Sequence, residues 1–459
     1  MPWKNKYVKE FLETVCREVR TKSVHKDITE ELEAHIEDQK NSYIKEGLDE
    51  ETATTKAIKQ MGDPVLIGKQ MDMTHRPKTE WSILIMTAVL VIIAGVVQYL
   101  MTKTALGNND NFIRFLIYVP IGIIAFIIMY FIDYTRLERW SKYVYFSVLI
   151  ITIASVKFTS PVNGGYNQVY YFYLIITPIL AGVICNFRSK GYLGIIYCGL
   201  FYIGAYVPCI LMPSYSALYI LTISSLIIMT VAIEKGFFGG NKKISLVLVY
   251  FPTLLMIIIQ FLSFGQYRIQ RFVHFLKPGL DPSGYGYMPL RIKSLLSGAQ
   301  PVGRTILARD LAGKSIEWSL PGWNTDFTFT YIIAKFGYIF GIVIGAILII
   351  LIIRMFISVI KQKNAFGFII SFSACIAITA EILFYILSNL GLISPITVTL
   401  PFISFGASSF ILNMGLMGLL LSVYRRTDII SNKLKINVHK KQIFTFINGK
   451  FIIDFKRKA

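Results

Sequence analysis

The chain has 459 residues, of which 54% are hydrophobic and only 16% are charged, and its formal net charge is +20. Repeated apolar runs of about 20 residues match the length that a helix needs to cross a bilayer. This composition excludes a soluble enzyme and predicts an all-α, polytopic membrane protein. The excess of Lys and Arg lies in short loops and tails, where it sets orientation and attracts anionic membrane lipids, so we do not expect nucleic-acid binding.

Residues 1–78 are charged and amphipathic, which predicts a small soluble helical domain and no cleavable signal peptide. The apolar residues that recur at helical spacing are Val8, Phe11, Leu12, Val15 and Val19 in a first run and Ile28, Leu32 and Ile36 in a second. Gly47 predicts a helix end, Asp49 the cap of the next helix, and the Met-Gly-Asp-Pro sequence at 61–64 the end of a third. With the later His75-x-Pro77, this layout resembles the permease-prefix type of domain. The domain fits two roles equally, a solvated helical cap on the protein or a regulatory or docking module.

Residues 79–426 contain ten apolar segments that predict ten membrane-spanning helices. They are Trp81–Met101, Phe112–Ile132, Tyr143–Val156, Val169–Phe187, Tyr192–Leu211, Ala217–Ile233, Ile244–Phe264, Phe327–Ile353, Ala365–Leu387 and Leu400–Tyr424. The loops of one side carry Lys and Arg, whereas the short loops of the other side carry almost none. This pattern places both termini in the cytoplasm, the long loop 265–325 outside, and the basic tail 427–459 inside.

One carboxylate, Asp326, lies at the mouth of a long apolar helix in the sequence LPGWNTDFTFTYIIAKFG, Leu320–Gly337. An acid at a membrane boundary needs a partner or a function. A functional role is one interpretation, and a structural cap stabilised by the helix dipole is the other.

Two further segments have a composition that suits a polar site. The external loop begins Tyr-Arg-Ile-Gln-Arg-Phe, in which Arg268 and Arg271 suit the phosphate of an anionic lipid headgroup or pair with acids of the loop itself. The last helix opens with Pro, Ser and Thr residues at 394–409, which predict either a broken helix entry that lines a polar cavity or a tight helix contact through small residues.

Taken together, three ordered motifs resemble the SEDS family, the FtsW/RodA/SpoVE group of bacterial cell-wall polymerases. They are YRIQRF…LKPGLDPSGYGY in the external loop, LPGWNTDFTF…FGYIFG around Asp326, and LPFISFGASSFILNMGLMGLLLSVYRR at the last helix. The resemblance covers about residues 80–426 and implies the same ten-span topology.

The resemblance implies a peptidoglycan glycosyltransferase that polymerises lipid II, outside the bacterial cytoplasmic membrane, in wall synthesis linked to cell shape, division or sporulation. It also implies a class B penicillin-binding protein as partner. By position, Asp326 matches the family's essential aspartate, which activates or orients the acceptor hydroxyl, and burial would raise its pKa and make it a better base. The expected substrate-binding residues are Arg268, Arg271, Thr325, Ser404, Ser408 and Ser409. No metal-ligating set is visible, and Mg²⁺ is the one cofactor left open.

The chain departs from the family pattern at several positions. Tyr170–Thr177 contains no Glu or Lys where the family carries both, Gly322 replaces an acid, and Ala334-Lys335 replaces a Glu. Two alternatives to the enzyme therefore stay open. The first is a catalytically inactive relative that acts as a scaffold or regulator of wall synthesis. The second is a lipid-linked precursor transporter that uses the intramembrane acid Glu381.

Overall fold

A computed structural model describes residues 6–104, 109–158, 167–212, 214–262, 266–307, 315–429, 444–447 and 450–453. The chain divides into two compact units. The first consists of Met1–Thr79, Lys361–Ala365 and Tyr424–Lys435, and the second of Glu80–Ile360, Phe366–Val423 and Ile436–Ala459.

The first unit contains four α-helices and one 3₁₀ turn. They are α1 (Lys6–Glu18), η1 (Lys22–Val24), α2 (His25–Lys45), α3 (Glu50–Met61) and α4 (Pro64–Thr74). Their core is built from Phe11, Leu12, Val15, Val19, Val24, Ile28, Leu32, Ile36 and Ala57, so the predicted apolar runs are buried. The Asp49 carboxylate caps α3 by accepting from the Thr52 amide at 3.0 Å, and Gly62 ends α3 with φ +93°, as the sequence predicted.

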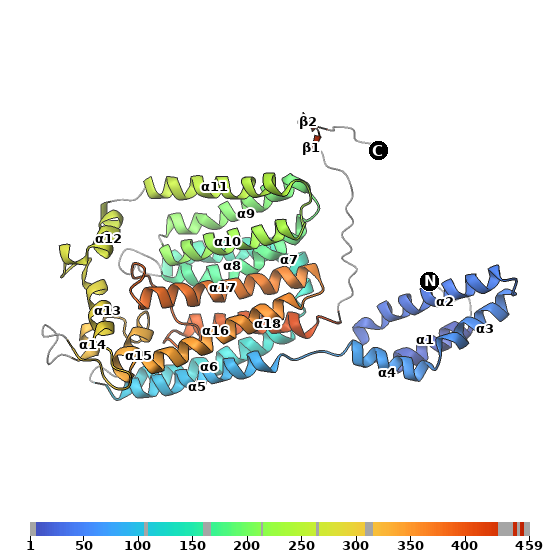
Figure 1. Ribbon diagram of the computed structural model, residues 1–459, viewed down its shortest axis with the longest axis horizontal. Helices are drawn as coiled ribbons and strands as arrows, with labels where there is room; N and C mark the ends of the chain where they lie inside the picture. The colour runs from blue at the N-terminus through green and yellow to red at the C-terminus, as the bar shows by residue number, and fades with distance from the viewer. Residues whose placement is uncertain are drawn as a thin grey trace. The chain divides into compact units, whose positions relative to one another are not determined.

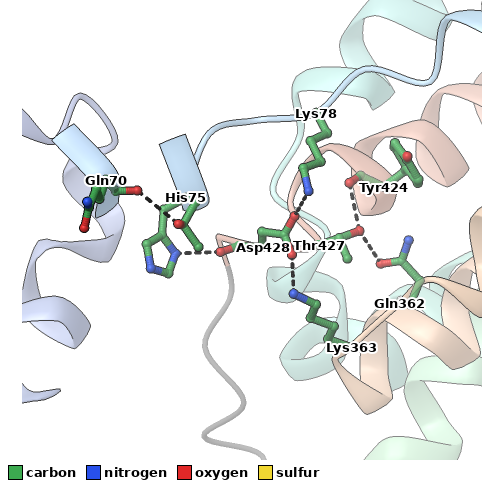
Figure 2. A network of polar contacts seen from close by, with 9 residues as sticks. Gln70, His75, Lys78, Gln362, Lys363, Tyr424, Thr427 and Asp428 are labelled. Carbon is green, nitrogen blue, oxygen red and sulfur yellow. Dashed lines mark hydrogen bonds and ion pairs between the residues drawn. The ribbon is translucent and has the colours of Figure 1, made fainter. Parts of the chain in front are cut away.

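A polar network around Asp428 joins the three chain segments of this unit (Figure 2). Lys78 and Lys363 each place an ammonium group 2.6 Å from the Asp428 carboxylate. A ring nitrogen of His75 lies 2.7 Å from the Asp428 carbonyl oxygen. Burial opposes ionisation of Asp428, but the two lysines outweigh it and hold its pKa below the usual value. Ile429, the next residue, packs against the apolar core.

The second unit is a bundle of long helices that run side by side (Figure 1). They are α5 (Trp81–Thr102), α6 (Asn109–Phe131), α7 (Thr135–Ala154), α8 (Asn167–Asn186), α9 (Gly191–Leu211), α10 (Tyr215–Glu234), α11 (Lys242–Leu262), α16 (Tyr338–Ile360), α17 (Ala365–Asn389) and α18 (Ala407–Arg425). The 3₁₀ turn η2 (Ser155–Phe158) follows α7. Among the residues described, nine helices are long and apolar enough to cross a membrane. The helix outside that set is α7, because charged residues lie in its first half.

Short helices gather at one end of this bundle (Figure 1). They are α12 (Gln266–Leu276), η3 (Pro278–Leu280), α13 (Tyr287–Ser297), α14 (Ile316–Ser319) and α15 (Thr328–Phe336). The predicted long loop therefore contains regular structure. Near the C-terminus, β1 (Phe444–Ile447) and β2 (Lys450–Ile453) pair as an antiparallel hairpin in which Phe444 is opposite Ile453.

Two predicted helices are interrupted or begin later than expected beside this end of the bundle. The segment Phe327–Ile353 is not one helix, because Gly337 adopts φ +106° and separates α15 from α16. A Cβ at residue 337 would lie 2.4 Å from the Pro301 carbonyl oxygen, so only glycine fits. The last helix begins at Ala407 rather than Leu400, and residues 394–406 form an irregular segment before it.

Candidate functional site

Asp326 lies in a tight turn, 320–327, that connects α14 to α15. Gly322 takes φ +73°, a conformation that glycine adopts without strain. Its carbonyl oxygen accepts hydrogen bonds from the Thr325 amide at 3.1 Å and from the Phe327 amide at 2.9 Å. The turn thus fixes the backbone on both sides of Asp326, and the left-handed conformation at residue 322 favours glycine.

The first turn of α15 is capped by side chains of α17. The Phe329 amide donates to the Tyr385 hydroxyl at 3.0 Å, and the Thr330 amide donates to the Asn389 side-chain oxygen at 3.0 Å. The same Asn389 donates its side-chain N–H to the Asp326 carbonyl oxygen at 2.9 Å. Amide groups at a helix N-terminus need such partners because they have none within the helix. Asn389 therefore caps α15 and holds the Asp326 backbone at once.

The Asp326 carboxylate itself is left free for chemistry. The N-cap position of α15 is occupied by Phe327, with no side-chain cap, so the alternative role of Asp326 as a cap is wrong. Among the described residues, none makes a hydrogen bond or ion pair with the Asp326 carboxylate, although Tyr171 and Tyr385 interact with it electrostatically. The residue is half-buried, and burial raises the pKa of Asp326 to about 7. A carboxylate with that pKa is matched to general-base catalysis near neutral pH.

A buried ion pair braces the two helices that flank this turn. Lys335 of α15 lies 3.1 Å from a carboxylate oxygen of Glu317 in α14, and the Tyr331 hydroxyl donates to the same oxygen at 3.0 Å. The Glu317 side chain is only 2% exposed. Burial opposes its ionisation, but hydrogen bonds from its own backbone, Lys335 and Tyr331 outweigh it and keep the pKa of Glu317 below the usual value. The Trp323 ring packs on Tyr331 with centroids 4.9 Å apart.

The irregular segment 394–406 closes the site from the side of α18. The Phe405 amide donates to the Asn324 carbonyl oxygen at 3.1 Å, which ties this segment to the Asp326 turn. The Ser404 hydroxyl donates to the Tyr385 hydroxyl at 3.3 Å. Ser404 is buried, so it supports the residues that cap α15.

The other predicted substrate residues have different surroundings. Arg271 donates to the Pro395 carbonyl oxygen at 2.6 Å, so it holds the irregular segment beside the site. Arg268 lies in α12, but its side chain is outside the described set. Ser408 is exposed at the start of α18. The Thr325 hydroxyl donates to the Gly322 carbonyl oxygen at 3.4 Å, within the turn itself.

A second acid, Glu381, lies deeper in the bundle. Its residue exposure is 0%. One carboxyl oxygen accepts from the Tyr170 hydroxyl of α8 and from the Ser409 hydroxyl of α18 at 3.3 Å, and Thr399 lies 3.4 Å away. Asn413, one turn after Ser409, is also within hydrogen-bonding reach. The predicted substrate residue Ser409 is therefore a partner of Glu381 rather than a group that faces Asp326.

Tyr385, Asn389 and Glu317 were not singled out from the sequence, whereas Glu381 was singled out only as the intramembrane acid of a possible transporter. Glu381, Tyr385 and Asn389 follow one another at intervals of four, which places them on one face of α17, and polar residues with that spacing in an apolar helix are the signal that was available. Glu317 carried no such signal. Within the described ranges, no group of three or more His, Cys, Asp or Glu residues could hold a metal ion.

Comparisons with known proteins agree with this architecture. The family model described as "Cell cycle protein", FTSW_RODA_SPOVE, matches residues 171–429, more than half of the chain. The probable peptidoglycan glycosyltransferase FtsW of Borreliella burgdorferi is 28% identical over 69% of this chain and 88% of its own length. The peptidoglycan glycosyltransferase MrdB of Escherichia coli K12 is 23% identical over 79% of this chain and 100% of its own length.

Solved structures show the same fold. A chain from a study of the structural coordination of polymerization and crosslinking by a peptidoglycan synthase complex superposes with a TM-score of 0.60, at 16% identity, over 76% of this chain and 98% of that chain. The rod shape determining protein RodA of Thermus thermophilus superposes with a TM-score of 0.51, at 16% identity, over 76% of this chain and 97% of its own. The chain is thus a multi-pass membrane protein, and it belongs to the FtsW/RodA/SpoVE family of cell cycle proteins.

Proposed function

We propose that the protein is a peptidoglycan glycosyltransferase that polymerises lipid II at the outer face of the bacterial cytoplasmic membrane. Relatives that bear this activity in their names align over most of their length. The observation that carries the proposal is the state of Asp326. It is a half-buried carboxylate with a pKa of about 7, it is free of ion-pair partners among the described residues, and its backbone is held by Asn389.

In the proposed reaction the acceptor hydroxyl of one sugar attacks the anomeric carbon of another, and the bond from that carbon to the lipid pyrophosphate breaks. Asp326 takes the proton of the acceptor hydroxyl as the new glycosidic bond forms. The electron pair of the broken bond leaves with the pyrophosphate. Positively charged residues of α12 and α13 are the candidates to stabilise that leaving group, because Arg groups bind phosphate through paired hydrogen bonds.

Polymerisation of purified lipid II by wild type, Asp326→Asn and Asp326→Ala tests this proposal. Both variants should fold and insert but lose turnover, because neither can accept a proton. Glu234→Gln is a matched control, since Glu234 forms a half-exposed pair with Lys242 at 2.8 Å, away from Asp326 in the chain. Wild-type turnover by Asp326→Asn would refute the assignment, and an inert wild type with its partner present would favour the scaffold role.

The proposed partner is a class B penicillin-binding protein, which would cross-link the glycan strands. Co-purification of the full chain with each such protein of the same bacterium tests it, and stimulation of lipid II polymerisation by one of them is the expected result. Failure of every candidate to bind or stimulate would count against the partnership.

The proposed topology places both termini in the cytoplasm and the short helices α12 to α15 outside. Cysteines introduced at Ser283 and Lys242, both exposed, should react with a membrane-impermeant reagent from opposite sides. Labelling of both from one side would contradict it.

A further inference from the structure

The two carboxyl oxygens of the buried acid Glu381 have different surroundings. Its Oε1 atom accepts from Tyr170 and from Ser409, but within the described part of the chain its Oε2 atom is buried without any hydrogen-bond partner. A buried carboxylate oxygen that lacks a donor is costly, and more so when it carries charge. Among the described residues, no Lys, Arg or His forms an ion pair with Glu381 that could offset this cost.

Asn413 presents the complementary unsatisfied atom. Its side-chain N–H donates to the Ser409 carbonyl oxygen at 3.0 Å and to the Ser409 hydroxyl at 3.2 Å. That carbonyl oxygen is an acceptor, so it fixes the orientation of the amide with the nitrogen toward Ser409. Among the described residues, the Asn413 Oδ1 atom is then buried without a partner, and the Asn413 side chain lies next to Glu381. Two buried acceptors that both lack a donor need one proton between them.

Glu381 is also connected to the Asp326 turn by two routes. Along α17, Tyr385 and Asn389 lie one and two turns beyond Glu381, and both cap α15. Through the irregular segment, Thr399 donates to Ser409 at 2.6 Å, and this segment is tied to the turn further along. Both routes end on backbone groups next to Asp326.

We propose that Glu381 is a positioning residue that works in its protonated form, in which Oε2 donates to Asn413 Oδ1 while Oε1 accepts from Tyr170 and Ser409. A neutral acid with these three bonds joins α8, α17 and α18 without an uncompensated charge in the bundle. The joined helices then hold the residues that fix Asp326. The expected effect of Glu381 on turnover rests on the proposed function, whereas its protonation state does not.

Infrared difference spectroscopy on the full protein tests the protonation state. Spectra are taken at pH 6 in the Asp326→Asn background, so that Asp326 does not contribute. The C=O stretching band of a protonated carboxylic acid should be present and should disappear in Glu381→Gln. It should move to higher frequency in Asn413→Leu, which removes the acceptor. The matched control Glu317→Gln should leave the band in place, because Glu317 is ionised beside Lys335.

The groups that face Glu381 are Tyr170, Thr399, Ser409 and Asn413, and Tyr171 interacts with it electrostatically. A spectrum in which Glu381→Gln removes no such band overturns the proposal.

Turnover separates a positioning role from packing alone. Glutamine reproduces the shape and both hydrogen-bonding directions of a neutral acid, so Glu381→Gln should retain most of the turnover of wild type. Glu381→Ala should lower kcat per folded molecule by about tenfold or more with little change in KM, because a small displacement of a catalytic group is costly. Equal turnover in Glu381→Ala and wild type would remove the positioning role. An inert wild type that keeps the infrared band would refute the proposed function but leave the protonated Glu381 intact.

Discussion

At the scale of single residues, Asp326 should make stability depend on pH in a direction that a helix cap would not. Its pKa in the folded protein is about 7, against an ordinary value of 3.8. Between these values the folded state binds a proton that the unfolded state has lost, so stability falls as pH rises from 4 to 7 and then stays low. Asp326→Asn does not titrate, so its melting temperature should exceed that of wild type by more at pH 8 than at pH 5.

Thermal unfolding in detergent at the two pH values measures this difference. A cap role predicts the opposite sign, since replacing a capping carboxylate does not stabilise a helix. Turnover should rise with pH and reach half its maximum near pH 7, because only the ionised carboxylate accepts a proton.

The sequence located Asp326 but not the residues that hold it. Asp326 was identifiable because a lone acid at the start of an apolar helix is costly without a function. Tyr385 and Asn389 lie about 60 positions along the chain, and their contact with α15 depends on how α17 packs. Ser404 and Ser409 were assigned to the substrate, yet packing directs them to Tyr385 and Glu381 instead. Spacing within one segment could not reveal these partners.

Asn389 should be essential for placing Asp326. Asn389→Ala removes the donor to the Asp326 carbonyl and the acceptor of the Thr330 amide, and each buried group left unpaired costs about 1–3 kcal/mol. Asn389→Asp keeps the acceptor but loses the donor to Asp326. We therefore expect Asn389→Ala to lower both the melting temperature and turnover, and Asn389→Asp to restore stability more than turnover. Parallel recovery of both properties in Asn389→Asp would make the residue structural only.

At the scale of helices and turns, the sequence predicted helix ends correctly where a glycine or a capping residue sets the boundary. Asp49 and Gly62 fix the ends of α3 as expected. The helix break at Gly337 was not predicted, because Gly337 lies within a continuous apolar run. The break arises from close contact with the backbone of Pro301, which is far from Gly337 in sequence. The late start of α18 has a similar origin, since residues before Ala407 bond to the Asp326 turn instead of continuing the helix.

The pair of Glu317 and Lys335 should determine how firmly α14 and α15 enclose the Asp326 turn. Lys335→Ala leaves a buried carboxylate with only Tyr331 and its own backbone as donors, and we expect a loss of about 2 kcal/mol in stability. Glu317→Gln in the same chain removes the unpaired charge and should recover part of the loss. Chemical unfolding of the two single variants and the double variant measures the coupling, and strict additivity would show that the ion pair contributes nothing.

At the scale of the whole molecule, the first unit draws on three separate parts of the chain, although only residues 1–78 have the composition of a soluble domain. No sequence pattern joins Lys363 and Asp428 to that domain, because both lie in loops next to membrane-spanning helices. They join the domain through the Asp428 carboxylate, which pairs with Lys78 of the domain and with Lys363. The Asp428 side chain is only 8% exposed.

The last prediction is that residues 1–78 regulate the protein and do not take part in its chemistry. No residue of the Asp326 site comes from this segment, so a deletion up to Lys78 should keep lipid II polymerisation by the protein that inserts. The deletion removes Lys78 and His75 from Asp428, and Asp428→Asn in the full chain is its matched partial variant. Each lysine is more than half exposed, so Asp428→Asn should cost on the order of 1 kcal/mol. It should make the segment 1–78 easier to remove with protease, with polymerisation unchanged. Complete loss of polymerisation in a deletion protein that inserts normally would show that the segment is part of the catalytic unit.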